Sequence, residues 1–117
     1  MAEEAQVALF LMGMKQAAQE RFILVDRKKN LDALAKRGMT VNDAKRTILG
    51  LMPCHYVSGP NPNHNVPGES VWIFCVILGD EEIYIKLDVR TGSSNACICI
   101  SFHEASETSH LPYKRSE

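Results

Sequence analysis

Three side chains that could carry out acid–base chemistry lie on two neighbouring segments of this sequence. Tyr84 and Lys86 are two residues apart in the run 82–89, and His103 ends the run 96–103. Both runs alternate apolar and polar residues, which is the pattern of a β-strand with one buried face. The Gly, Ser and Asn residues within 92–95 predict a turn between the two strands. A phenol, an amine and an imidazole would therefore share one face of an antiparallel hairpin.

The alternation also predicts a register for this hairpin. We expect Val89 to pair with Ala96. This register sets Tyr84 opposite Ser101 and diagonal to His103. The even-numbered residues of the second run then face the core. The odd-numbered residues share the open face with Tyr84, and they are Cys97, Cys99, Ser101 and His103.

The three side chains fit the cleavage of RNA without a metal ion. That reaction needs a base for the 2′-hydroxyl proton, an acid for the leaving 5′-oxygen, and a cation beside the phosphate. Histidine titrates near neutral pH, so His103 suits the base, while Lys86 can hold the phosphate and Tyr84 can orient or donate. The expected products are a cyclic phosphate and a free 5′-hydroxyl. The alternative is a solvated sheet face on which these residue types fall by chance.

Composition limits where a nucleic acid could bind. The 117 residues are 45% hydrophobic and 23% charged, as in one ordinary globular domain. A net charge of -1 argues against a large basic surface, so any RNA must meet a local patch. We expect Arg90 and Lys114 to add charge to that patch beside Lys86, and Tyr56 to stack on a base. The sequence has no apolar run as long as a membrane span and no secretory signal, which predicts a cytoplasmic protein.

The cysteines allow a metal-site alternative. Cys97 and Cys99, with His103 and a residue such as Cys54, are ligand types that suit zinc. Two residues apart on a flat strand, however, two sulfurs lie about 6 to 7 Å apart, which is wide for one tetrahedral ion. We therefore expect small half-buried side chains, no metal site and no cofactor. Cysteines that form no disulfide framework also indicate a reducing compartment.

The elements that must position these residues predict an α+β fold in one domain, 1–117. We expect a helix and a short strand in 1–25, a helical hairpin in 26–52, an antiparallel meander in 70–103 and a tail in 104–117. The proline-rich stretch 53–69 predicts a long ordered loop or a mobile flap. Leu111, Pro112 and Tyr113 could hold the tail against the sheet.

The helical hairpin carries clear start and stop signals. Asp26 can cap its first helix, and Gly38 can end that helix. Thr40 and Asp43 form the pattern of a capping box at the start of its second helix. A helix-turn-helix that binds DNA would have a similar pattern, but the apolar strands need these helices as cover. We expect Leu31 and Leu34 of the first helix to face inward, and Val41, Ala44, Ile48 and Leu51 of the second.

An ordered set of short motifs supports a more specific interpretation. They are Asn30 with Leu34, Gly38-Met39-Thr40, Ile48 with Leu49, Tyr56-Val57-Ser58-Gly59-Pro60, Trp72-Ile73-Phe74, Tyr84-Ile85-Lys86, Ser101-Phe102-His103-Glu104-Ala105 and Pro112-Tyr113-Lys114. In this order, over about 27–114, the sequence resembles the MqsR (motility quorum-sensing regulator) family, the toxins of type II toxin–antitoxin systems.

The resemblance implies a fold like that of the RelE ribonucleases, with an antiparallel sheet of three or more strands and N-terminal helices packed against it. It implies a metal-independent mRNA endoribonuclease, or mRNA interferase, that inhibits translation and growth and has a cognate antitoxin as its partner. Matched by position, the family's catalytic residues fall on Tyr84, Lys86 and His103. A family lysine and a family glutamine fall on Val57 and Ile73. The alternative is a non-catalytic module that binds a protein or regulates transcription.

Overall fold

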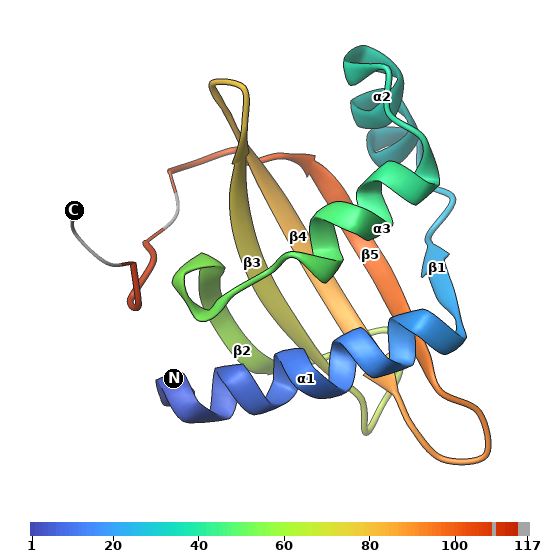
Figure 1. Ribbon diagram of the computed structural model, residues 1–117, viewed down its shortest axis with the longest axis vertical. Helices are drawn as coiled ribbons and strands as arrows, with labels where there is room; N and C mark the ends of the chain where they lie inside the picture. Colours follow the sequence, from blue (N-terminus) through green and yellow to red (C-terminus); the bar gives the residue numbers. More distant parts are fainter. Residues whose placement is uncertain (109, 115–117) are drawn as a thin grey trace.

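Three helices pack against one face of a five-stranded sheet, and within the described residues no helix covers the other face (Figure 1). This computed structural model describes residues 1–108 and 110–114. The helices are α1 (Glu4–Glu20), α2 (Lys28–Arg37), α3 (Val41–Leu49) and the short 3-10 helix η1 (Pro53–His55). The strands are β1 (Phe22–Leu24), β2 (Tyr56–Pro62), β3 (Ser70–Leu78), β4 (Glu81–Arg90) and β5 (Ala96–Glu104). The predicted α+β class is confirmed.

The strand order is β1-β5-β4-β3-β2. The predicted meander forms its centre, because β3, β4 and β5 pair antiparallel in sequence order. The short edge strand predicted near Phe22 is β1, which pairs parallel with β5. At the opposite edge is β2, so the prediction of a long ordered loop or a mobile flap over 53–69 is wrong for its first half. Proline lacks an amide hydrogen, and an edge strand is where Pro60 and Pro62 are tolerated.

The core lies between the helices and the covered face of the sheet. Helix α1 buries Val7, Leu11 and Met14, which recur at helical spacing as the sequence predicts. On the sheet side they meet a layer of apolar residues from the three central strands, namely Phe74, Val76, Ile83, Ile85, Leu87, Cys97, Cys99 and Phe102. Among the described residues, no helix has the length and apolar character needed to cross a membrane. The core therefore fixes one face of the sheet and leaves the other for polar groups.

Local chemistry explains where α2 begins and ends. The prediction that Asp26 caps α2 is wrong, because Arg27 takes the N-cap position and makes no side-chain capping bond. Gly38 ends the helix in the left-handed region, with φ 62°, where glycine avoids a Cβ clash. Leu34 is buried as expected, whereas Leu31 is 45% exposed. The apolar face that α2 buries is therefore narrower than the sequence predicts.

Helix α3 follows its predicted signals closely. The Thr40 hydroxyl accepts a hydrogen bond from the Asp43 amide, and the Asp43 carboxylate accepts one from the Thr40 amide. Ala44 and Ile48 are buried in α3, and Leu51 is buried just beyond it, while Val41 is exposed. Helix α2 contacts β5, and α3 contacts α1. Helix α2 thus packs on the sheet itself, and α3 packs on α1.

The predicted register of the central hairpin is wrong by two residues at its open end. Tyr84 pairs with His103, and Lys86 pairs with Ser101. Towards the turn, Leu87 pairs with Cys99, so the pairing shifts by one residue between Lys86 and Leu87. The unmatched residue is Ile100, which makes a β-bulge in β5.

This bulge changes which residues of β5 are buried. On the turn side of it, Cys97 and Cys99 face the core and are fully buried. On the other side, Phe102 faces the core and His103 lies on the open face beside Tyr84. The expectation that both cysteines share a face with His103 is therefore wrong. One extra residue breaks the period of two on which that expectation depends.

Candidate active site on the open face of the sheet

Tyr84 and His103 are direct cross-strand neighbours on the open face. Their ring centroids lie 5.7 Å apart with the planes 25° from parallel, so the two rings stack. Lys86 follows two residues after Tyr84 on the same face and pairs with Ser101. All three predicted catalytic side chains are half-buried. The structure therefore brings them together more closely than the predicted register did.

The backbone fixes which nitrogen of His103 carries the proton. Its Nδ1 lies 3.0 Å from the carbonyl oxygen of Glu104. A carbonyl oxygen can only accept a hydrogen bond, so Nδ1 must be the donor. In the neutral ring, Nε2 then keeps its lone pair. His103 is thus held in the tautomer that can accept a proton at Nε2.

Tyr84 is positioned to keep its proton. Partial burial raises the pKa of the Tyr84 phenol above its ordinary value of 10.0, because an apolar surrounding disfavours the phenolate. The phenol is therefore a hydrogen-bond donor at neutral pH. Beside it, His103 offers an acceptor, so the stacked pair supplies one group of each kind.

A cation outside the predicted set of site residues joins this site. The Arg27 guanidinium donates to the Ser101 hydroxyl and to the Ile100 carbonyl, each at 3.3 Å. Ser101 also pairs with Lys86, so the two cationic residues Arg27 and Lys86 are both neighbours of Ser101. The available sequence signal was only a basic residue between the expected short strand and the expected helical hairpin. The contacts of Arg27 with Ile100 and Ser101 could not be predicted, because the bulge at Ile100 was not predicted.

Asn30 holds the bulge against α2. This side chain is fully buried, and its amide donates to the carbonyls of Val25 and Ile100 at 3.1 and 3.0 Å. Its oxygen accepts a hydrogen bond from the Phe102 amide at 2.9 Å. These bonds satisfy backbone groups on both sides of the bulge. Asn30 therefore fixes the point at which β5 turns His103 towards the open face.

Arg90 lies further along the same face and is engaged with Asp88. The Arg90 guanidinium is 3.6 Å from one carboxylate oxygen of Asp88, which is 1% exposed. The Asn63 amide donates to that oxygen at 3.3 Å, which ties the β2–β3 loop to the open face. The other oxygen, Oδ1, has no hydrogen-bond partner in the described part of the chain. Arg90 thus contributes less free positive charge than the sequence suggested.

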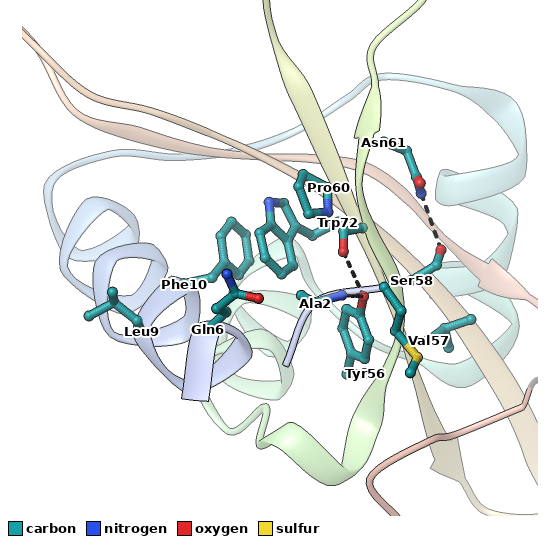
Figure 2. A pocket seen from close by; sticks show the side chains of 12 residues that line it. Ala2, Gln6, Leu9, Phe10, Tyr56, Val57, Ser58, Pro60, Asn61 and Trp72 are labelled. Atoms are coloured by element: carbon teal, nitrogen blue, oxygen red, sulfur yellow. Dashed lines mark hydrogen bonds between the residues drawn. The ribbon is translucent and has the colours of Figure 1, made fainter. Parts of the chain in front are cut away.

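Tyr56 does not fit the role expected for it. It is fully buried, and its hydroxyl accepts from the Ala2 amide at 3.1 Å and donates to the Gly59 carbonyl at 2.6 Å. Figure 2 shows this hydroxyl turned towards Ala2, in a hollow between α1 and β2 where Phe10 stacks on Trp72. The prediction that Tyr56 stacks on an RNA base is therefore wrong, because no face of its ring is accessible.

Three further positions singled out by the sequence lie near the site or away from it. Lys114 is exposed in the tail and lines a pocket that also includes Glu82, the residue two before Tyr84 on β4. Ile73, where the MqsR family has glutamine, pairs directly with Lys86. Val57, where that family has lysine, lines the hollow between α1 and β2. The site therefore has an apolar neighbour on the β3 side of Lys86.

Cys97 and Cys99, the cysteines of the metal-site alternative, are part of the core. Burial, with a smaller effect from Asp88, raises the pKa of the Cys97 thiol to about 12, and burial also raises the pKa of Cys99. Such thiols resist the deprotonation that zinc binding requires. Within 1–108 and 110–114, no three His, Cys, Asp or Glu side chains gather as metal ligands would.

Comparison of the chain with models of protein families, with curated proteins and with solved structures gives no match. The resemblance to the MqsR toxins therefore stays a prediction from the sequence motifs.

Proposed function

We propose that this protein is a metal-independent endoribonuclease that cleaves mRNA, with Tyr84, Lys86 and His103 as its catalytic residues. The observation that carries the proposal is the stacked pair of Tyr84 and His103, with Lys86 next to it on the same open face. A proton donor, a proton acceptor and a cation within one small patch are the groups that phosphodiester transfer requires.

The tautomer of His103 and the protonated state of Tyr84 assign the two proton transfers. His103 Nε2 takes the proton of the ribose 2′-hydroxyl, whose oxygen then attacks the phosphorus. Tyr84 gives its proton to the 5′-oxygen as the P–O5′ bond breaks. The products are a 2′,3′-cyclic phosphate and a 5′-hydroxyl, and solvent then takes the proton from His103 and returns one to Tyr84. Lys86 stabilises the negative charge that develops on the phosphate oxygens.

The charge distribution supports a small RNA footprint. The net charge of the chain is -1, so a general attraction to polyanions is absent. Lys86 and Arg27 nevertheless flank the position of Ser101 on the open face. We infer that binding depends on a few phosphate contacts around the scissile bond and weakens as salt rises.

A cleavage assay with matched variants tests the assignment. A mixed RNA is incubated in EDTA with the wild type, Lys86→Ala, His103→Ala and Tyr84→Phe. We expect a loss of about 100-fold or more for Lys86→Ala and His103→Ala, because each removes a group that acts in the transition state. Lys45→Ala on α3 is the control, since Lys45 lies on a helix that covers the opposite side of the sheet. Equal cleavage by all the proteins, or cleavage by none, would refute the assignment.

We further propose that the protein acts in the cytoplasm as the toxin of a type II toxin–antitoxin pair and is held inactive by a protein antitoxin. The order of the MqsR-like motifs supports this part. Expression of the wild type should arrest growth and deplete mRNA, and His103→Ala should do neither. A second candidate is a non-catalytic binding module, which the apolar Ile73 beside Lys86 favours. That module would leave cellular mRNA intact in both strains.

A further inference from the structure

A second hollow, here called the tail pocket, borders the open face. It has a volume of about 880 Å³ and lies between η1, the C-terminal half of β3 and the tail. Strand β2 begins at Tyr56, opposite Phe74, and so it does not extend alongside this half of β3. Figure 1 shows η1 and the tail on the same side of β3, where they flank that gap. The residues of its wall used below are Met52, His55, Ile77, Glu82 and Leu111.

The tail pocket adjoins the candidate active site. Cys75, which lines the pocket, pairs directly with Tyr84. Glu82, which also lines it, precedes Tyr84 by two residues on the same face of β4. Residues so placed on a strand lie about 7 Å apart. A ligand bound across Tyr84 and His103 can therefore reach the pocket within one residue or nucleotide.

The wall combines apolar surface with the polar ring of His55. Met52, Ile77 and Leu111 supply the apolar part. The Nδ1 of His55 lies 3.0 Å from the Met52 amide, which can only donate, so Nδ1 is an acceptor. Burial lowers the pKa of His55, which favours the neutral ring with its proton on Nε2. His55 is therefore a neutral donor in a largely apolar hollow.

This chemistry suits a flat, neutral, partly polar ligand. A pocket of several hundred Å³ with a few convergent polar groups is typical of small-molecule and nucleotide sites. A phosphate would be disfavoured beside the Glu82 carboxylate, while the exposed Lys114 at the rim can meet one outside. Single-stranded RNA presents flat, neutral bases that proteins remove from the stack and hold in such pockets.

We propose that the tail pocket binds one unpaired nucleobase of an RNA strand that lies across Tyr84 and His103. The identity of the ligand rests on the proposed function, since that function places RNA on the open face. The base packs against Met52, Ile77 and Leu111, and an acceptor on its edge receives the Nε2 hydrogen of His55.

The test measures the binding of the four nucleoside 5′-monophosphates by NMR, with the Met52 methyl group as the reporter. Ile77→Trp fills the pocket from β3, and Leu111→Trp fills it from the tail. Leu9→Trp is the matched control, because Leu9 is an exposed aliphatic residue that lines the other hollow. At least one monophosphate should shift the Met52 signal saturably. Both pocket variants should weaken that binding about tenfold or more, and Leu9→Trp should change it less than about twofold.

The outcomes separate this proposal from the ribonuclease proposal. No saturable shift at Met52, or equal weakening by Leu9→Trp and by both pocket variants, overturns the pocket even if the wild type cleaves RNA. Pocket-dependent binding by a protein that cleaves no RNA supports the pocket and overturns the ribonuclease.

A second measurement links base binding in the tail pocket to the cleavage of RNA. The wild type should cleave an RNA that lacks one base next to the cut about tenfold more slowly than the intact RNA, and Ile77→Trp should show no such difference. An equal difference in both proteins would contradict the pocket.

Discussion

The substitution Asn30→Ala should destabilise the fold by about 2–4 kcal/mol. It leaves the buried Phe102 amide without a partner, which costs about 1–3 kcal/mol, and it removes two further bonds worth about 1 kcal/mol each at most. The two carbonyls keep other donors, because Val25 still accepts from the Arg27 amide and Ile100 from the Arg27 guanidinium. The estimate is therefore dominated by the single orphaned amide.

Urea denaturation followed by circular dichroism measures this loss directly. Asn42→Ala is the control, because Asn42 is an exposed asparagine on a helix and its removal should cost less than about 0.5 kcal/mol. A loss below about 1 kcal/mol for Asn30→Ala would refute the claim that Asn30 fixes the bulge. If the bulge also positions His103, cleavage of RNA by folded Asn30→Ala should fall although Asn30 lies outside the catalytic set.

Two further predictions follow from the titrating groups. A hydrogen bond to its own backbone amide, with help from Arg37 and Lys36, holds the pKa of the Glu104 carboxyl below 4.5. The ionised carboxylate therefore stabilises the fold above that pH, and this stabilisation is lost as the pH falls below it. Urea midpoints should therefore drop more steeply below about pH 5 in the wild type than in Glu104→Gln, and parallel curves would contradict this. In the native protein at pH 8, iodoacetamide should modify Cys54 first, because the other three thiols are buried. Mass spectrometry that finds Cys97 or Cys99 modified as fast as Cys54 would show that the core is open.

Strong local signals made much of the fold predictable. The alternation in 82–89 and the apolar run before it defined the meander, and Thr40 with Asp43 defined the start of α3. The stretch 53–69 was harder, since its prolines are compatible with an edge strand only where a neighbour such as β3 is already in place. Burial of Leu31 and Val41 was over-predicted, because the sequence does not reveal how wide a face each helix turns to the core.

The site was predictable in its residues but not in its geometry. Tyr84, Lys86 and His103 do share one face, as alternation indicates. The direct pairing of Tyr84 with His103 depends on the bulge at Ile100, which is stabilised by Asn30 and Arg27 from α2. These contacts join residues about 70 positions apart, and a pattern read along one strand has no information about them. Tyr56 shows the same limit, since its burial depends on Ala2.

The bulge makes the path of the backbone at Ile100 more important than the identity of its side chain. Ile100 is only half-buried, so many side chains could replace it at modest cost. A strand that kept Ile100 but had no bulge would instead restore an unbroken period of two, and everything from Ser101 onward would change face relative to Cys97 and Cys99. Phe102 would then leave the core and His103 would enter it. Deletion of Ile100 would remove the extra residue together with its bulge, so Tyr84 and His103 should stay paired although the carbonyl that accepts from Asn30 and Arg27 is lost.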